Sequence, residues 1–404
     1  MNNNSNKFQN KLPEGAAIAV LIVSSDKTQL MQFQGDKKAW PVYLTIGNIS
    51  KDVCRQPSTH ATILVGYLPV VKLHCYTEAT CSLNGYHLFH ACMSKIFDCL
   101  VKAGNEGVEM VCADGYMQKV YPILTAYVAD YPEQCLVACC NENWCLCCAV
   151  DPDNQGSPLD SLFQGVSATL HVLEDHKCDK DPKHFDNEGL RAIYTPFWAN
   201  LPHCNIFSCF TPDLLHQLHK GVFKDHLVEW CTSLIGASEL DARFKAMAGC
   251  PGLQHFKGIS GVLQWTGTEH KEMQKVFLGV LAGAISWEVY AVTCALIDFI
   301  YYTQFQSHTT KSLDALEKCL ATFHQHKNIL IKLGVCEHFN IPKLHSILHY
   351  INAIRALGST DGYNLESPEC LHIEFTKEGY HSSNKCDYLE QMALWLQRRE
   401  AMWI

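Results

Sequence analysis

Two apolar segments, each followed by an acidic residue, constrain the fold of this chain most strongly. Residues 16–23 form an uninterrupted run rich in Ile and Val, and Asp26 follows it. Residues 120–128 form a second apolar run, and Asp130 follows that one. An unbroken apolar run, as opposed to an alternating one, is typical of a strand buried on both faces. The pattern predicts a covered sheet with an acid at the end of each of two strands.

Further patterns complete an α/β first half. Residues 40–46 and 61–68 are β-like and are separated by Gly47-Asn48 and a polar connection, which indicates a hairpin or meander. Apolar residues at helical spacing predict a helix over 86–103 that stops before Gly104 and packs on the sheet. The Tyr-Pro-Glu sequence after Asp130 predicts a turn, because a residue before proline avoids the helical region.

The second half has the periodicity of helices. Thr211-Pro212 predicts a helix cap followed by a first-turn proline, with an apolar stripe from Leu214 to Trp230. The same pattern predicts helices over residues 271–284, 288–305, 313–333 and 343–357. Residues 151–187 are polar and without period, so we expect a loop-rich connector there.

Composition excludes several classes of protein. A net charge of −9 argues against nonspecific coating of nucleic acid, so any contact with DNA must be local. No apolar segment is long enough to span a bilayer and the N-terminus does not resemble a signal peptide, which favours an intracellular protein. In such a compartment we expect the 22 cysteines to be reduced, most of them as small buried side chains.

Acids at strand ends suggest metal chemistry, although 41 acidic residues make such sets easy to find. Carboxylate oxygens suit Mg²⁺, and two ions a few Å apart stabilise the attacking and the leaving oxygen of a phosphoryl transfer. A ribonuclease-H-like nuclease builds such a site from two strand-end acids and a third acid on a distant helix. The competing interpretation is that Asp26 is a turn or cap residue and Asp130 an ordinary acid in a turn.

Motifs along nearly the whole chain resemble those of Plavaka-type fungal DNA transposases, which are related to the CACTA superfamily of DDE transposases. The resemblance runs in order from Leu12 to Ile404. It is carried in the first half by Ser24–Leu30, Ala39–Ile49, Ala126–Gln134 and Thr211–Gly221. It continues with Gln264–Gly267, Asp298–Tyr302, Glu337–Lys343 and Asp361–Glu366.

The resemblance implies three catalytic acids, Asp26, Asp130 and Glu366, which would hold two Mg²⁺ or Mn²⁺ ions. Glu369 competes with Glu366, since the two lie three residues apart and share a face if the segment is helical. Asp213 and His216 match an Asp-x-x-His element of the superfamily. An acid in the first turn of a helix is also favoured by the helix dipole, so a structural role for Asp213 stays open.

The resemblance also implies an architecture: an α/β, ribonuclease-H-like core interrupted by a large, mainly helical insertion. We expect a disordered tail over residues 1–12 and the first part of the core over 13–150. A loop-rich connector would follow over 151–205, then the helical region over 206–357, and the last part of the core, with the third acid, over 358–404. The expected partners are transposon terminal repeats, target DNA and further copies of the chain.

Cys145-x-x-Cys148 has the spacing of half a structural zinc site. Candidates for the other half are His171, His176, Cys178, His184 and His203. His345 and His349 are four apart on a predicted helix and could bind metal, but the leucines beside them favour a half-buried helix face.

The alternative to an active transposase is a truncated, catalytically inert remnant that acts at most as a DNA- or protein-binding module. The chain begins almost at the first catalytic strand, and Cys370 stands where relatives usually carry Arg. An active enzyme would work in the nucleus, although the chain carries no clear localisation signal, and an inert remnant would be cytoplasmic.

Overall fold

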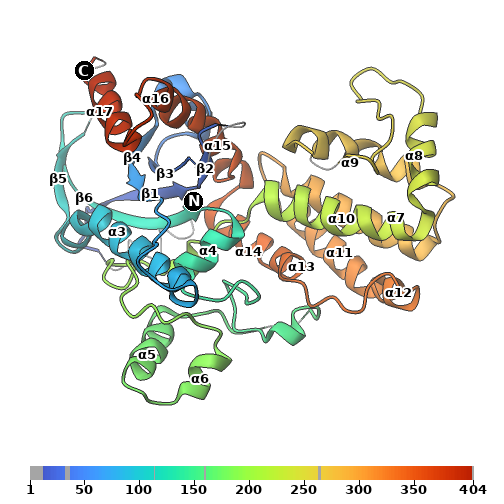
Figure 1. Ribbon diagram of the computed structural model, residues 1–404, viewed down its shortest axis with the longest axis horizontal. Coiled ribbons are helices and arrows are strands. Elements are labelled where there is room, and N and C mark those ends of the chain that lie inside the picture. Colours follow the sequence, from blue (N-terminus) through green and yellow to red (C-terminus); the bar gives the residue numbers. More distant parts are fainter. Residues whose placement is uncertain (1–11, 32–36, 113, 159–160, 263–264, 403–404) are drawn as a thin grey trace. The chain divides into compact units, whose positions relative to one another are not determined.

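The computed structural model describes residues 12–31, 37–112, 114–158, 161–262 and 265–402. These residues form two compact units (Figure 1). The first contains the residues up to 149 together with 162–211 and 363–404, and the second contains 150–161 and 212–362. The predicted tail lies outside the described residues except for Leu12. Among the described helices, none is both long and apolar enough to cross a membrane.

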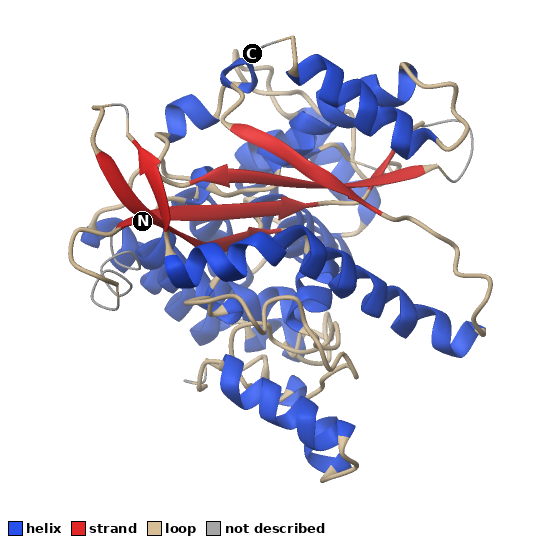
Figure 2. Cartoon of the chain, turned by 90° about the vertical axis from the view of Figure 1, so that its left-hand side faces the viewer, coloured by secondary structure: helices blue, strands red, loops and turns tan. Residues whose placement is uncertain are grey.

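A six-stranded mixed sheet forms the centre of the first unit (Figure 2). Its order is β2-β3-β1-β6-β5, and β4 also pairs with β3. Strands β1 and β6 are parallel, and the other pairs are antiparallel. The strands are β1 (Ala17–Ser25), β2 (Thr28–Gln29), β3 (Lys38–Ile46), β4 (Thr62–Leu68), β5 (Val108–Val111) and β6 (Met117–Val128).

Helices cover both faces of this sheet, which is why β1 and the second half of β6 are mainly apolar. Consecutive residues of β3 point to opposite faces, because side chains alternate along a strand. Val42 belongs to the core formed with α3 (Glu78–Glu106) and α4 (Tyr131–Ala138). Tyr43 packs on Leu371 and Phe375, which belong to α15 (Glu366–His372) and η7 (Ile373–Lys377).

The remaining elements of the first unit are short, apart from α5 and α17. They are α2 (Lys51–Cys54), η1 (Pro57–Thr59), α5 (Val166–Lys177), α6 (Pro182–Asn187), η3 (Ile206–Ser208), α16 (Glu378–His381) and α17 (Tyr388–Glu400).

The second unit is helical and is built around η4 (Leu214–Val228), a π-helix. Leu218 and Phe223 of η4 are fully buried in a core shared with Phe277 and Phe299. The other elements are η2 (Pro152–Asn154), α7 (Glu229–Ile235), α8 (Ala237–Ala246), α9 (Gly267–Leu281), α10 (Trp287–Thr303), α11 (Thr310–His326), α12 (Asn328–Lys332), α13 (Pro342–Ser346), η5 (Ile347–His349), α14 (Tyr350–Leu357) and η6 (Thr360–Gly362).

Several local predictions need correction. The segment after Asp130 is the helix α4 and not a turn, because Pro132 occupies a first-turn position where its missing N–H is not needed. Thr211 does not cap the next helix: η4 begins at Leu214, and Asp213 is its cap. The polar connector contains the helices α5 and α6.

Candidate functional site

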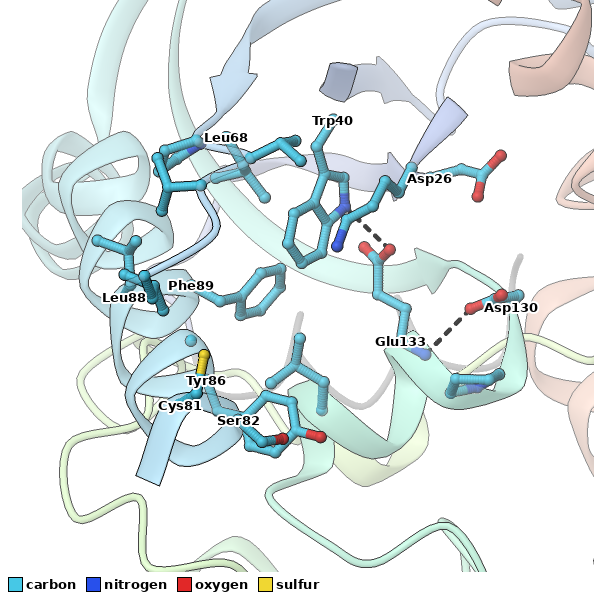
Figure 3. A pocket seen from close by; sticks show the side chains of 18 of the residues that line it. Asp26, Trp40, Leu68, Cys81, Ser82, Tyr86, Leu88, Phe89, Asp130 and Glu133 are labelled. Carbon is cyan, nitrogen blue, oxygen red and sulfur yellow. Dashed lines mark hydrogen bonds between the residues drawn. The ribbon is translucent and has the colours of Figure 1, made fainter. Parts of the chain in front are cut away.

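The sheet brings Asp26 and Asp130 to one edge. Ser24 of β1 pairs with Val128 of β6 in parallel register, and each acid lies two residues beyond its member of that pair. Carboxyl ends of parallel strands meet at the same edge of a sheet, so the two acids leave it side by side. Both line a cavity of about 430 Å³, and Figure 3 shows their side chains near its Glu133 end.

Asp130 also begins a helix. It is the N-cap of α4, and its Oδ1 accepts a hydrogen bond from the backbone N–H of Glu133 at 3.0 Å. This bond fixes the orientation of the carboxylate and satisfies one free N–H of the helix start. The side chain stays partly exposed, so capping leaves it within reach of a ligand.

The proposed third acid lies on α15, which is tied directly to Asp26. Glu366 and Glu369 stand in the first turn of α15, and both are partly exposed. At the other end of the helix, His372 Nε2 lies 3.1 Å from Asp26 Oδ2, and its Nδ1 lies 3.0 Å from the hydroxyl of Tyr43. His372 was not predicted from the sequence. Its position three residues after Glu369 is the one local signal that could have identified it.

Glu133 is a second residue that the sequence did not single out. Its carboxyl is buried and accepts a hydrogen bond from Trp40 Nε1 at 2.9 Å (Figure 3). It is also bonded to Ser25 Oγ. Ser25 Oγ in turn lies 2.5 Å from the hydroxyl of Tyr127. Burial is the main cause that raises the pKa of Glu133 to about 8, and the nearby Asp130 and Asp26 add to it. At neutral pH this carboxyl is therefore mostly protonated.

The cavity beside these acids has apolar walls and carries two cations. Trp40, Leu68 and Phe89 line its apolar side. Lys27 Nζ lies 4.2 Å from the centre of the Trp40 ring, and the guanidinium of Arg191 lies 4.4 Å from that of Tyr86. Burial lowers the pKa of Lys27, and the neighbouring acids Glu133 and Asp130 oppose that shift. A carboxylate pair next to cations and apolar walls can hold a metal ion and accept an anionic substrate.

Asp213 and His216 belong to the second unit. The carboxylate of Asp213 makes its hydrogen bonds with residues at the start of η4. Asp213 is buried and accepts from the backbone N–H groups of Leu215 at 2.9 Å and His216 at 3.1 Å. Its Oδ2 also lies 2.9 Å from His216 Nδ1. This is the geometry of a helix N-cap with a histidine one turn later.

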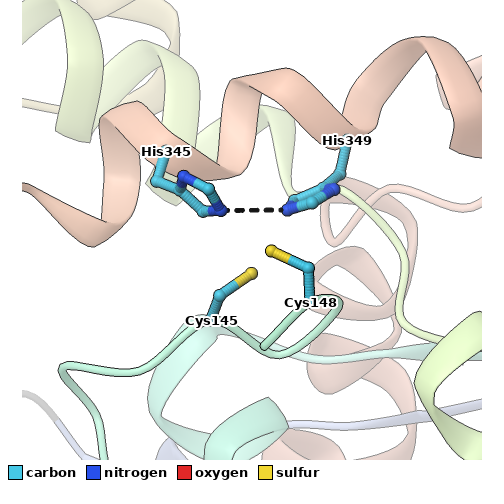
Figure 4. Close-up of side chains that lie close together, drawn as sticks. All are labelled: Cys145, Cys148, His345 and His349. Atoms are coloured by element: carbon cyan, nitrogen blue, oxygen red, sulfur yellow. Dashed lines mark hydrogen bonds between the residues drawn. The ribbon is translucent and has the colours of Figure 1, made fainter. Parts of the chain in front are cut away.

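The predicted half zinc site is a loop in which Cys145 and Cys148 are both buried. Cys145 Sγ accepts a hydrogen bond from the backbone N–H of Cys147 at 3.3 Å, as a metal-binding loop would provide. On the helical segment, His345 is buried and its Nε2 lies 3.3 Å from His349 Nε2 (Figure 4).

Among the described residues, the five suggested partners of the cysteine pair form no group with it: His171, His176, Cys178, His184 and His203. His176 instead stacks on Phe185 with ring centres 3.7 Å apart, and its Nδ1 lies 3.0 Å from the Tyr194 hydroxyl. No disulfide joins cysteines within the described part of the chain.

Comparison with known families gives one finding. The model of the Plavaka transposase family matches residues 1–231, which is more than half of the chain and includes Asp26, Asp130 and Cys145. Comparison with curated proteins gives no match.

Proposed function

Since the chain belongs to the Plavaka transposase family, we propose that it cleaves and joins DNA with a DDE-type site formed by Asp26, Asp130 and Glu366. The observation that carries the proposal is the parallel pairing of β1 with β6, which sets Asp26 and Asp130 at one edge of the sheet. The bond between His372 and Asp26 supports α15 as the helix that supplies the third acid.

We further propose that the first unit is a ribonuclease-H-like core. Three antiparallel strands, β4, β3 and β1, are followed across the sheet by β6, which is parallel to β1. Such a fold carries its metal-binding acids at the ends of these central strands and on a later helix. In this interpretation, residues 212–362 are the insertion between the second and the third acid.

The carboxylates fit Mg²⁺ or Mn²⁺, which prefer oxygen ligands. Two such ions would supply activation of the attacking oxygen and stabilisation of the leaving one. The protein orients the ligands: Glu133 N–H fixes Asp130, and His372 fixes Asp26. Lys27 and Arg191 line the adjoining cavity, where they can attract a phosphate of the DNA strand.

The test is Mg²⁺- or Mn²⁺-dependent nicking of DNA that carries the element's own terminal repeats. Asp26→Asn and Asp130→Asn keep size and hydrogen-bonding capacity but remove the charge that binds the metal, so each should reduce nicking by at least about 100-fold. Asp114→Asn is the matched control, because Asp114 is an exposed turn residue bonded to the N–H of Tyr116 at 3.0 Å. Equal nicking by wild type and Asp26→Asn would contradict the proposal.

The same experiment addresses the alternative function. A wild-type chain that binds terminal-repeat DNA but does not nick it with either metal would be an inert binding module. We propose that the active form is a homo-oligomer, because joining two ends needs two sites; light scattering with and without end DNA tests this.

We also propose that Cys145 and Cys148 are ligands of a structural Zn²⁺. Two thiolates from a Cys-x-x-Cys loop are typical ligands of closed structural zinc sites. The burial of both side chains suits a structural ion, which has no open position for substrate.

A further inference from the structure

Three lysine side chains of the second unit gather around one carboxylate. The Nζ atoms of Lys220, Lys224 and Lys343 lie 3.6, 3.6 and 3.3 Å from the carboxylate oxygens of Asp225. One carboxylate compensates one ammonium, so the cluster retains an excess of about two positive charges. Ammonium groups held this close repel one another, and an external anion would relieve the repulsion.

The π-helical turn of η4 creates part of this cluster. In an α-helix of 3.6 residues per turn, Lys220 and Asp225 would point to different sides, because they are five positions apart. The hydrogen bonds of a π-helix join residues i and i+5, so its wider turn places both side chains on the same side. Wide turns of this kind occur frequently at functional sites.

Gly221 makes room for the third lysine. A Cβ at this position would lie 2.5 Å from Lys343 Cδ and 2.9 Å from the carbonyl oxygen of His216. The aliphatic part of Lys343 therefore crosses η4 where η4 has no side chain. Lys343 itself comes from the first turn of α13, which begins at Pro342. The cluster thus depends on a close approach between two helices.

The surroundings of the cluster add little negative charge. The lysines together lower the pKa of Asp225 against the opposing effect of its burial, so the carboxylate stays ionised and the ammonium groups remain in excess. His270 lies near the cluster, and the two acids that act on its pKa are Asp225 and Glu269. The carboxylate of Glu269 is bonded to Thr266 in a capping box. The three lysine side chains are between 30% and 52% exposed, so their ammonium groups reach solvent.

We propose that Lys220, Lys224 and Lys343 form a surface that binds the phosphate backbone of duplex DNA. The choice of DNA as the polyanion rests on the proposed function. A chain with a net charge of −9 repels DNA over most of its surface, so binding needs a local excess of cations. The ammonium groups come from two helices, so they suit several phosphates along one duplex. A single small anion does not offer several phosphates.

The test is the salt dependence of binding by the full chain to a duplex oligonucleotide of arbitrary sequence. Each neutralised phosphate adds about 0.9 to the slope of log affinity against log salt. The triple variant Lys220→Gln, Lys224→Gln, Lys343→Gln should lose about two from this slope and bind at least tenfold more weakly at low salt. A control with the same change in net charge is Lys311→Gln, Lys318→Gln, Lys332→Gln, which alters exposed lysines of α11 and α12.

A single variant gives the opposite expectation. Asp225→Asn removes the compensating carboxylate, so DNA should bind more tightly and the slope should rise by about one. Equal losses in both triple variants, or a less stable Asp225→Asn protein that binds DNA as the wild type does, would overturn the proposal. Failure of the catalytic proposal and failure of this one are distinguishable, because the first is measured by metal-dependent nicking and the second by the salt dependence of binding without divalent metal.

Discussion

His372 Nε2 lies 3.1 Å from Asp26 Oδ2, which joins the last turn of α15 to the end of β1. The other ring nitrogen of His372 lies 3.0 Å from the hydroxyl of Tyr43, whose side chain is fully buried on the same face of the sheet. The imidazole is therefore held at both nitrogens. Any oxygen of Asp26 that binds a metal is oriented by this histidine, in the way that outer-shell partners orient metal ligands elsewhere.

Replacing His372 should weaken metal activation more than it weakens folding. His372→Gln removes the held ring, so we expect nicking to need a higher Mg²⁺ concentration and to fall about 10–100-fold at a fixed low concentration. Mg²⁺ titration of nicking measures the effect. Tyr43→Phe, which keeps the ring packing and removes only the hydroxyl, should show a smaller shift. An unchanged Mg²⁺ midpoint in His372→Gln would show that the histidine only packs there.

Removing the charge of Glu366 and of Glu369 in separate variants distinguishes their roles. Both stand in the first turn of α15, one turn apart on the same side of the helix. We expect Glu366→Gln to abolish nicking, like Asp26→Asn, while Glu369→Gln keeps most of it. If the two results are reversed, Glu369 is the third acid and the proposed DDE site keeps its form with a different ligand.

Zinc should copurify with the chain at one ion per molecule, measured by mass spectrometry of the metal content. Cys148→Ala removes one thiolate, so we expect loss of the ion and a lower melting temperature. Cys147→Ser is the matched control, because Cys147 is a partly exposed cysteine of the same loop that is not one of the two predicted ligands. Cysteine and histidine must lose protons to bind, so zinc should be released as the pH falls. Full zinc content in Cys148→Ala would contradict the assignment.

The central strands could be predicted because their local amino-acid composition reflects their burial. β1 and the second half of β6 are largely buried and consist mainly of apolar residues, and the middle of β3 is also buried. β5 was missed because Val108–Val111 is a short edge strand in which all four residues are exposed. α6 was missed because its six residues are mostly polar and bury only Phe185.

The site was predictable only where it depends on strand ends. Asp26 and Asp130 follow apolar runs, so their meeting at one edge could be anticipated from the sequence. Glu133 and His372 gain their importance from bonds to residues 93 and 346 positions away in the chain, and no local pattern records such pairings. The lysine cluster depends on a π-helical turn, which helical periodicity does not distinguish from an ordinary one.

Gly189 should be intolerant of even the smallest side chain. Its φ of +59° is unfavourable for other residues, and a Cβ there would lie 2.1 Å from Cε2 of the Trp144 ring. We expect Gly189→Ala to cost about 2–4 kcal/mol of unfolding free energy. Gly115→Ala is the control, since Gly115 also has a positive φ but has nothing within 4 Å of its Cβ position. Urea denaturation of both variants separates backbone strain from the clash, and equal costs would contradict the role of Trp144.

Glu133 should make stability fall as the pH rises. Its pKa is about 8 in the folded protein and near 4.5 in the unfolded chain, so between these values the folded state holds one more proton. The unfolding free energy therefore falls progressively from pH 4.5 to pH 8, by roughly a few kcal/mol in total. Glu133→Gln imitates the protonated carboxyl, so the unfolding free energy of the variant relative to wild type should rise across this window and level off above it.

Urea denaturation from pH 4.5 to 9, without added divalent metal, measures the difference, and Glu109→Gln on the exposed strand β5 serves as control. Parallel curves for wild type and Glu133→Gln would mean that Glu133 is ionised in the folded protein, stabilised by its bonds to Ser25 and Trp40.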